Sequence, residues 1–328
     1  VYAGDDGPYC GGSFTTPQGN FVAYNSDGTF GGIYTIDLVE DGGDGHSFRP
    51  WDDEYYNFGT YNHIQRPDEK WNAGGFAHYT ISDHFEPYLE VMFMRDFTDA
   101  QIAPSANFGR TSQINCDNPM LSDQQLELIC TQGGYGPNDY ATVYVYRRNV
   151  EGGPRTSQIG HTDYRLVAGL RGDINDSWSY DLYGLQAEST TDDLFVGDFS
   201  IERLANALDV IVDSDTGEWV CRSRDPGCVP WNVFQEGAVT QEAVDYLSTV
   251  ALMLGENRTR VLNLTFTGDL EHYGAKLPSA SEGLQVAVGT EYRTQFLRIS
   301  PDEVNLTGAA GFIGSAERVS GTVDVKEL

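Results

Sequence analysis

Basic residues are scarce in this chain of 328 residues. Only three lysines occur, Lys70, Lys276 and Lys326, and the formal net charge is −29 at pH 7. A nucleic-acid-binding surface needs clustered lysine and arginine to neutralise phosphates, so the composition excludes nucleic acid as a partner. The acidic residues gather in glycine-rich stretches such as 40–44, where we expect solvated loops that aid solubility or attract cations.

Long hydrophobic runs are also missing. A transmembrane helix needs about 20 consecutive apolar residues, and the best candidate, residues 246–254, is far shorter. Any membrane-spanning part of the chain must therefore be β-structure. The chain opens at Val1 without a charged and apolar signal segment and stops at Leu328 within a strand-like run, and we interpret it as a fragment of a longer protein.

The motifs of catalytic and metal sites are missing as well. The six histidines show no HExxH spacing, and no serine lies in a G-x-S-x-G elbow. We therefore expect no enzyme activity and no catalytic, cofactor-binding or metal-binding residues. Residues 25–28 and 213–217 resemble the start of a calcium-binding loop in their Asp and Asn content. Neither segment continues to a bidentate glutamate, so plain β-turns are the better interpretation.

A glycine-rich segment, residues 307–315, looks like the nucleotide-binding loop of sugar-nucleotide epimerases. That loop must follow a buried strand and open a helix, with an acidic ribose partner about 20 residues further on. Here an alternating, strand-like run at 319–325 follows the glycines and the sequence ends at Leu328. We therefore predict a flexible outer loop without a cofactor.

Five cysteines indicate an oxidising compartment. Cys116 and Cys130 flank a short helical pattern that has capping-box spacing at Ser122 and Gln125. Cys221 and Cys228 flank a tight Asp-Pro-Gly turn. These spacings predict two local disulfides that staple loops, and none of them matches a zinc knuckle. Cys10 is left without a partner.

Two segments alternate apolar and polar residues with a period of two, which predicts strands. In 260–270 the apolar positions are Leu262, Leu264 and Phe266, and in 284–297 they include Val286 and Val288. The intervening residues are Asn, Thr, Gln, Glu and Arg. One face of the predicted sheet is therefore apolar and the other is polar.

The same alternation organises most of the chain. We predict hairpins at 68–97, 162–188 and 258–298 and a last strand at 316–328 with Val319, Val323 and Val325 outward. Residues 1–67, 98–161 and 189–257 have loop composition. Within the third loop, Ser200 and Thr240 can cap short helices, the second carrying an apolar stripe that ends at Gly255.

These elements predict an all-β fold. Strands of roughly ten residues, with tight turns at one end and very long polar loops at the other, are typical of an antiparallel transmembrane β-barrel. Seven spanning strands are expected, with long extracellular loops that carry short helices.

The order of several short motifs resembles the TonB-dependent outer-membrane receptors. The run Tyr56-Asn57-Phe58 through Asn62 to Glu69 is similar to the family's entry into a barrel strand. Further similar pieces follow in the family's order, so that the resemblance covers most of residues 56–328: 152–155, 172–181, 221–232, 289–293 and 321–327.

The resemblance implies a receptor in the bacterial outer membrane that binds a scarce solute with its outer loops and imports it with TonB energy. The resemblance leaves four classes of solute open: iron chelates such as siderophores, cobalamin, oligosaccharides and peptides. Seven strands would be about a third of the roughly 22 expected for such a transporter. The family's N-terminal plug, which contacts the inner-membrane TonB complex, and its closing strands are not part of this sequence.

Two groups of side chains are candidates for function. Loop aromatics could stack on a ligand above the lumen: Trp51, Tyr55, Tyr56, Tyr135 and Trp231. Arg165, Arg171 and Arg293 are expected to line the lumen and to pair with plug carboxylates. Trp71 and Trp178, near strand ends, fit an interfacial girdle.

Two other functions remain open. A secreted acidic β-protein that binds carbohydrate or calcium would also have Gly/Asp-rich loops with aromatic residues. It would cover Leu262, Leu264 and Phe266 with a second sheet. A passive porin would differ from the receptor only in lacking a plug.

Overall fold

The computed structural model describes residues 2–4, 7–9, 11–311 and 314–328. Cys10 and two residues of the glycine-rich loop, 312 and 313, lie outside the described residues. The chain is mostly antiparallel β-sheet, with 52% of residues in strands and 13% in helices. None of the helices in the described ranges is long and apolar enough to cross a membrane.

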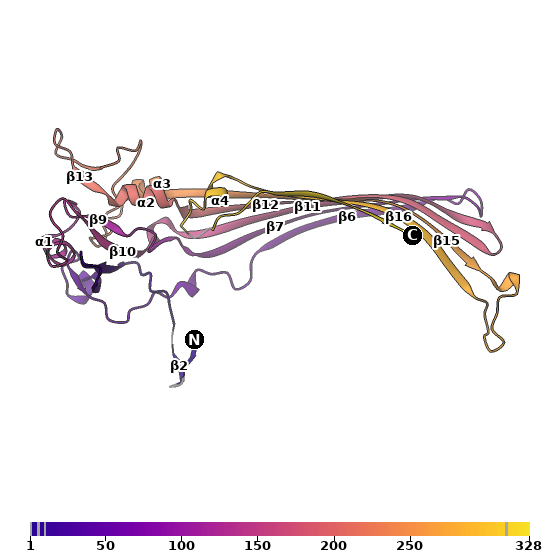
Figure 1. Cartoon of the computed structure of the whole chain (residues 1–328), viewed down its shortest axis with the longest axis horizontal. Coiled ribbons are helices and arrows are strands. Elements are labelled where there is room, and N and C mark those ends of the chain that lie inside the picture. Colours follow the sequence, from indigo (N-terminus) through magenta and orange to yellow (C-terminus); the bar gives the residue numbers. More distant parts are fainter. Residues whose placement is uncertain (1, 5–6, 10, 312–313) are drawn as a thin grey trace.

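The main element is a seven-stranded antiparallel sheet with the order β17-β16-β15-β12-β11-β7-β6. Figure 1 shows it as a long curved ribbon that extends to the right of a smaller, mixed region. Among the described residues the two outermost strands, β6 and β17, each pair on one side only, so the sheet is open. The strands span Asp68–His78 (β6), Glu86–Pro104 (β7), Pro154–Asn175 (β11), Trp178–Phe199 (β12), Ser248–Asp269 (β15), Gln285–Pro301 (β16) and Val319–Glu327 (β17).

These strands are much longer than the alternation predicted. β11, β12 and β15 have 22 residues each, or about 75 Å at ~3.4 Å per residue. The predicted loops 98–161 and 189–257 were therefore too long, because β7 continues to Pro104, β11 starts at Pro154 and β15 starts at Ser248. The polar, threonine-rich ends of these strands have loop-like composition, but their residues pair in a continuous ladder.

The helical stripe predicted to end at Gly255 is also shorter. Helix α3 spans Gln241–Leu247 and is capped by Thr240, as expected. The chain then enters β15, where Ala251 pairs with Phe195 and Leu254 pairs with Asp192. The apolar residues of 244–254 therefore fit a helix and a strand in succession.

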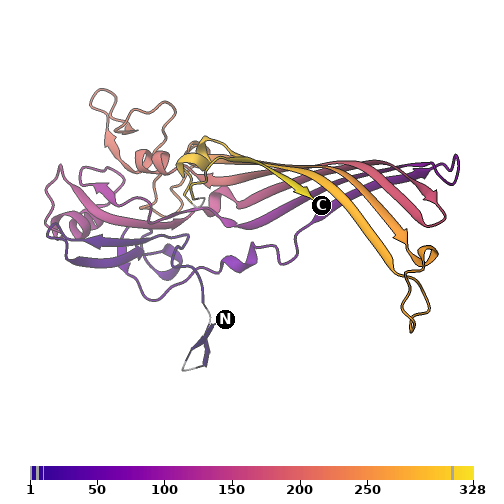
Figure 2. The same cartoon turned by 45° about the vertical axis from the view of Figure 1, so that its right-hand side comes forward.

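A second, smaller sheet lies beside one end of the long one (Figure 2). Its order is β5-β4-β3-β10-β8, with β9 also paired to β10. The prediction that residues 1–67 form a loop was wrong, since three of these strands come from that segment. The strands span Asn20–Tyr24 (β3), Phe30–Ile36 (β4), Phe48–Pro50 (β5), Ala106–Phe108 (β8), Gln113–Asn115 (β9) and Tyr140–Arg148 (β10).

The only extended apolar core of the described residues lies between the smaller sheet and short helices. Phe21, Val143 and Val145 enter it from the sheet, and Trp231 and Phe234 enter from a loop. The helices are α1 (Asp123–Leu126), the turn Glu127–Thr131, α2 (Ile201–Leu208) and α3. Ser122 and Gln125 form the predicted capping box at α1, and Ser200 caps α2.

Short elements complete the chain. They are β1 (Tyr2–Gly4), β2 (Gly7–Tyr9), β13 (Val210–Val212), β14 (Trp219–Cys221) and α4 (Glu303–Thr307), with single helical turns at Val39–Asp41, Phe58–Thr60, Val150–Gly152 and Glu271–Tyr273. The connections at one end of the long sheet are short, whereas those at the other end carry the smaller sheet and the helices.

Candidate functional site

The long sheet has two chemically different faces. Directly opposed residues of an antiparallel ladder lie on the same face, so the register assigns each side chain. One such row crosses five strands through Leu89, Ala168, Gly184, Leu262 and Tyr292. On this face, the apolar face, six strands each contribute four alternate residues, and we call this set the apolar band. It consists of Trp71, Ala73, Gly75, Ala77, Pro87, Leu89, Val91, Phe93, Tyr164, Leu166, Ala168, Leu170, Trp178, Tyr180, Leu182, Gly184, Leu262, Leu264, Phe266, Gly268, Val286, Val288, Thr290 and Tyr292.

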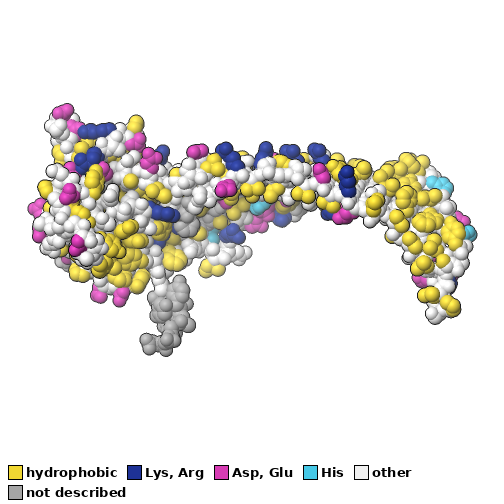
Figure 3. All heavy atoms as spheres, viewed as in Figure 1, with side chains coloured by type: hydrophobic (Ala, Val, Ile, Leu, Met, Phe, Trp, Pro, Cys, Tyr) yellow, Lys and Arg dark blue, Asp and Glu magenta, His cyan; other side chains and the backbone are white. Residues whose placement is uncertain are grey.

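The apolar band contains no Asp, Glu, Lys, Arg or His. Each strand contributes seven residues of length, or about 24 Å at ~3.4 Å per residue. Its large side chains are uncovered, since Leu262 is 57% exposed and Trp71 is 65% exposed. Among the described residues no second layer packs on this face. Figure 3 shows hydrophobic atoms gathered at the end of the long sheet that lies away from the smaller region.

The opposite face, the charged face, carries all the charged residues of the same stretches: Glu90, Arg165, Asp181 and Glu291. Arg171 and Arg293 lie on it just beyond the stretches, so the three arginines predicted to line a lumen share one face. Their charges are compensated locally. Arg165 bonds Glu90 at 2.6 Å, Arg171 bonds Glu86 at 2.6 Å, and Arg293 lies 3.3 Å from Glu291.

A hollow of about 640 Å³ lies over the middle of the sheet. Most of its lining comes from the charged face, including Asp163, Arg165 and Asn257, together with Met92 and Met94. Nearer the short turns, the Tyr88 hydroxyl donates to Asp181 at 2.8 Å. Hydrogen bonds and ion pairs therefore tie neighbouring strands together across this face.

A belt of arginines follows the apolar band on the side of the long connections. We call Arg95, Arg258, Arg260 and Arg298 the arginine belt; all four lie on the apolar face. Glu256, only 7% exposed, is held by Arg258 and Arg298, and Arg258 also lies 3.2 Å from Glu188. Figure 3 shows Lys and Arg atoms along the sheet between the hydrophobic end and the smaller region.

The last strand corrects the sequence prediction. Val325 is opposite Arg293, and Val323 is opposite Gln295, so the valines predicted to point outward lie on the charged face. Asp324 and Lys326 take the apolar face at the edge of the sheet. A shift of one residue in register moves every side chain of a strand to the other face, and the alternation within a single strand cannot reveal it.

The five predicted ligand-contact residues lie in different environments. Trp231 is completely buried and packs edge-on against Phe199 with ring centroids 5.7 Å apart, so its prediction as a ligand contact was wrong. Tyr135 is half-buried against the core, and its hydroxyl donates to the Tyr24 carbonyl at 3.0 Å while it accepts from the Thr142 amide. Both residues hold the smaller sheet together. Their loop-like sequence surroundings suggested that both residues are exposed, but composition carries no information about tertiary packing.

Tyr56 lies at the junction between the two sheets. The Arg148 guanidinium stands 5.3 Å from the centre of its ring, and burial raises the pKa of the Tyr56 hydroxyl to about 12. Arg148 donates to the carbonyl of Pro104 and to the Ser13 hydroxyl, and desolvation lowers its pKa. Tyr56 is therefore a structural contact that holds residues 13–56 against β10.

Trp51 and Tyr55 belong to a larger set of rings. On the side of the smaller sheet away from the core, Phe14 packs edge-on against Trp51 and Tyr146, each at 5.1 Å, and Trp51 against Tyr55 at 5.7 Å. Tyr24 packs edge-on against Phe30 and Tyr144, each at 6.0 Å. Phe30 is 60% exposed and Tyr55 51%. We call these seven residues the aromatic row.

The sequence reasoning missed five members of the aromatic row: Phe14, Tyr24, Phe30, Tyr144 and Tyr146. One signal was available, because Tyr144 and Tyr146 alternate with the buried Val143 and Val145. The remaining members come from other strands and loops. Only the pairing of β10 with β3 brings Tyr144 opposite Val22 and next to Tyr24.

The aromatic row and the charged face look to the same side of the molecule. Phe108 on β8 pairs with Tyr146 of the row. Its ring also lies 5.7 Å from the Arg155 guanidinium, and Arg155 is at an alternate position of β11 that it shares with Arg165 and Arg171. Phe108 and Arg155 therefore connect the side of the smaller sheet that carries the aromatic row with the charged face of the long sheet.

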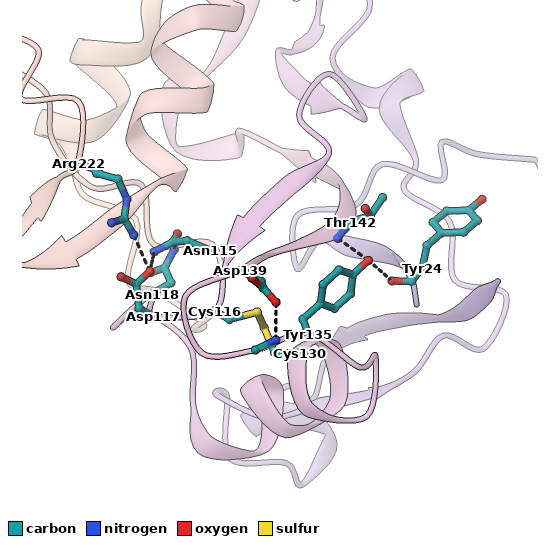
Figure 4. The surroundings of a disulfide bond; sticks show 11 residues. Tyr24, Asn115, Cys116, Asp117, Asn118, Cys130, Tyr135, Asp139, Thr142 and Arg222 are labelled. Atoms are coloured by element: carbon teal, nitrogen blue, oxygen red, sulfur yellow. Dashed lines mark hydrogen bonds and ion pairs between the residues drawn. A yellow bond between two sulfur atoms is a disulfide. The ribbon is translucent and has the colours of Figure 1, made fainter. Parts of the chain in front are cut away.

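Both predicted disulfides are present, Cys116–Cys130 and Cys221–Cys228. Figure 4 shows the first, with Asp117 beside it bonded to Arg222 at 2.5 Å. Arg222 also donates to Asp209 at 2.9 Å, and the hydrogen bonds that its guanidinium donates to these two carboxylates raise its pKa. The disulfides and this ion-pair cluster staple the loops around the core.

The calcium-like segments are turns. Asp213 accepts the backbone amides of Asp215 and Thr216 and bonds Arg224 at 2.5 Å, which lowers its pKa to about 2. Asp27 accepts from the amide and hydroxyl of Thr29. No cluster of three or more metal-ligating side chains occurs within the described ranges. At 307–315 a helix, α4, precedes the glycines, so the described part of this segment lacks the strand-loop-helix order of a nucleotide site.

Comparison of the chain with protein-family models, with curated proteins and with solved structures gave no match in any of the three. The class that the fold defines is an antiparallel β-protein with one open, two-faced sheet and a disulfide-stapled smaller sheet.

Proposed function

We propose that this chain forms part of the wall of a transmembrane β-barrel in a bacterial outer membrane. The observation that carries the proposal is the apolar band. Six strands present 24 residues without a charge on one face, and the charged residues of the same stretches lie on the other. Barrel strands alternate in this way because one face meets lipid and the other lines an aqueous lumen.

The dimensions and ends of the sheet support the proposal. An extent of about 24 Å along each strand is comparable to the apolar height of outer-membrane barrels. Trp178, Tyr180, Trp71, Tyr164 and Tyr292 lie toward the ends of the band, where aromatic girdles occur. The short connections at one end and the long ones at the other match periplasmic turns and outer loops.

Within this class, the barrel is that of a TonB-dependent receptor. The ordered motifs between residues 56 and 327 support this assignment by resemblance. The receptor binds an iron chelate, cobalamin or an oligosaccharide outside the cell. It imports the solute through a plug that contacts the energised inner-membrane TonB complex, and the chain is not an enzyme.

The aromatic row is the best candidate for ligand capture in this receptor. It lies on the side of the long connections and faces the same side as the charged face, so a captured solute would be directed toward the lumen. Exposed ring faces bind sugars and planar ligands by stacking. Trp51 and Tyr55 from the sequence-based set contribute to it, together with Tyr144 and Phe30.

The membrane assignment is tested by the solubility of the purified chain. We expect a monodisperse protein only in detergent, and insertion into phosphatidylcholine vesicles that survives alkaline extraction. A stable, monodisperse form in water without detergent would contradict the proposal.

Ligand capture is tested by titration of the detergent-solubilised protein with maltohexaose, cyanocobalamin and a ferric hydroxamate chelate. We expect one of the three to bind and its affinity to fall about tenfold in Trp51→Ala, since an aromatic contact contributes about 0.5–1.5 kcal/mol beyond area burial. Trp219→Ala is the matched control, because Trp219 is 47% exposed and lies outside the row. Equal losses in both variants would remove the row from the site.

The secreted acidic β-protein requires a second sheet over the apolar face. The exposure of Leu262 and of its neighbour Tyr292, at 57% and 44%, counts against that alternative. A passive porin would share the sheet but not the energy source. Uptake of the bound solute that stops when the inner membrane is de-energised distinguishes the receptor from the porin.

A further inference from the structure

The arginine belt occupies a specific position relative to the apolar band. On β7 and β15 the next position of the apolar face beyond the band is an arginine, Arg95 after Phe93 and Arg260 before Leu262. Arg258 is the next residue of the apolar face on β15 beyond Arg260, on the side away from the band. Arg298, on β16, is joined to this group through Glu256.

The belt is on one side of the band only. At the end with the short turns, the residues that follow the band at the same alternate spacing include no lysine or arginine; they are Tyr79, Phe85, Gly172, Asp176, Leu270 and Leu284. A bilayer with identical leaflets gives no reason for this asymmetry. A bilayer whose outer leaflet carries negative charge at its surface does, because cationic side chains are favoured there.

The charge balance of the belt also differs from that of the chain. The chain has 49 acidic and 20 basic residues, whereas the four arginines of the belt are matched on the apolar face by four carboxylates, Glu69, Glu188, Glu256 and Asp324. Glu188 and Glu256 are held by Arg258 and Arg298, and Glu69 accepts from the Trp71 indole at 2.8 Å. Among the described residues neither Arg95 nor Arg260 has an ion-pair partner, and both are exposed.

The chemistry of the neighbouring residues suits a phosphate. Arginine binds phosphate oxygens through two parallel N–H donors. Arg95 lies opposite Thr162 and Trp71, and Arg260 lies opposite Gln186 and Thr294. The Thr162 hydroxyl and the Gln186 amide can donate further hydrogen bonds to the same headgroup, whereas the Thr294 hydroxyl donates to Asp324 at 2.8 Å.

We infer that the arginine belt binds the phosphate groups of anionic lipid in the outer leaflet, with Arg95 and Arg260 as the principal contacts. This inference rests on the proposed membrane function. The long arginine side chains extend from the edge of the apolar band toward the headgroups while their stems lie along the sheet. The belt thereby fixes the depth of the barrel wall and favours a phosphorylated lipid surface.

The experiment compares binding of the full chain to vesicles of phosphatidylcholine alone and to vesicles that also contain diphosphoryl lipid A. The double variant R95Q/R260Q removes the two unpaired charges of the belt. The control is R165Q/R293Q, which removes the same number of arginines from the charged face. Insertion into phosphatidylcholine and far-ultraviolet circular dichroism verify that both variants fold.

We expect the wild-type chain to bind the lipid A vesicles more tightly than phosphatidylcholine vesicles. R95Q/R260Q should lose about 30-fold in this affinity, which is the contribution of two arginines near an anionic surface. R165Q/R293Q should retain the preference, and R95K/R260K should retain part of it. Salt should weaken the effect. Inorganic phosphate at the same ionic strength as chloride should not displace the lipid.

Four results would overturn the inference. Equal losses in the two glutamine double variants would indicate attraction by net charge alone, and displacement by inorganic phosphate would indicate a free-anion site. Tight insertion into phosphatidylcholine with no gain from lipid A would leave the membrane proposal standing and refute the lipid contact. Failure to insert into either vesicle would refute both.

Discussion

Replacement of Leu264 by arginine separates a lipid-facing sheet from one that lies in water. Leu264 is half-buried at the centre of the apolar band on β15, opposite Leu182 on one side and Thr290 on the other. In water the arginine stem would keep most of the neighbouring contacts and only its head would be solvated. A surface change of this kind costs about 0.5 kcal/mol or less.

In a bilayer the same side chain would lie near the hydrocarbon midplane. Arginine at that depth of an outer-membrane barrel costs about 2–4 kcal/mol, which lowers the ratio of folded to unfolded protein by roughly 30-fold to 1,000-fold. Leu262 lies at the edge of the band, next to Arg260. L262R should therefore cost clearly less than L264R.

The assay is urea unfolding of the protein inserted in phosphatidylcholine vesicles, followed by tryptophan fluorescence. The control is T267R, because Thr267 is exposed on the charged face of the same strand. We expect T267R to lie within about 0.5 kcal/mol of the wild type. Equal stabilities of L264R and T267R, or a cost for L262R as large as that for L264R, would refute the lipid-facing interpretation.

Three further predictions concern the smaller sheet and its core. Trp231→Ala should destabilise the chain by about 3–5 kcal/mol, since the side chain is fully buried; a loss below 1 kcal/mol in chemical denaturation would contradict its place in the core. Removal of the Cys116–Cys130 disulfide, whose partners are 14 residues apart, should cost about 3 kcal/mol of stability. Removal of Cys221–Cys228, whose partners are 7 residues apart, should cost about 2.5 kcal/mol. Limited proteolysis of these variants should cut first between 116 and 140 or between 210 and 228, and unchanged proteolysis would argue against the stapling role. Burial opposes ionisation of Glu151, but two hydrogen bonds of 2.6 Å from Arg147 outweigh this effect and lower the pKa of Glu151. The contribution of this ion pair to stability should therefore be complete above the unfolded pKa of about 4.3 and be lost as the pH falls through the lower folded pKa. E151Q should flatten the acid dependence of the melting temperature, and an unchanged acid dependence would show that the pair is not its source.

Period-two alternation was sufficient to predict most of the long sheet. Leu262, Leu264 and Phe266 on one face and Arg165, Arg171 and Arg293 on the other follow from the geometry of an extended chain, in which successive side chains point to opposite sides. Local signals also predicted the caps at Ser122, Ser200 and Thr240, which depend on hydrogen bonds within three residues. The two disulfides followed from short spacing beside a helix and a turn.

The smaller sheet could not be predicted from the same signals. Its strands come from residues 20–50 and 106–148, so their pairing depends on contacts between segments that are far apart in the sequence. Trp231 and Tyr135 lie in glycine-rich loop sequence, yet tertiary packing buries the first completely and the second partly. The aromatic row likewise exists only because β3, β4 and β10 pair in one register.

The sequence by itself determined that this chain is a β-protein with one apolar and one polar side, because that division is written residue by residue in each strand. Only the tertiary structure decided which strands are neighbours, where the ladders end, and on which face the last strand places its valines. Register and long-range pairing depend on the free energy of the whole assembled sheet, which no single segment contains.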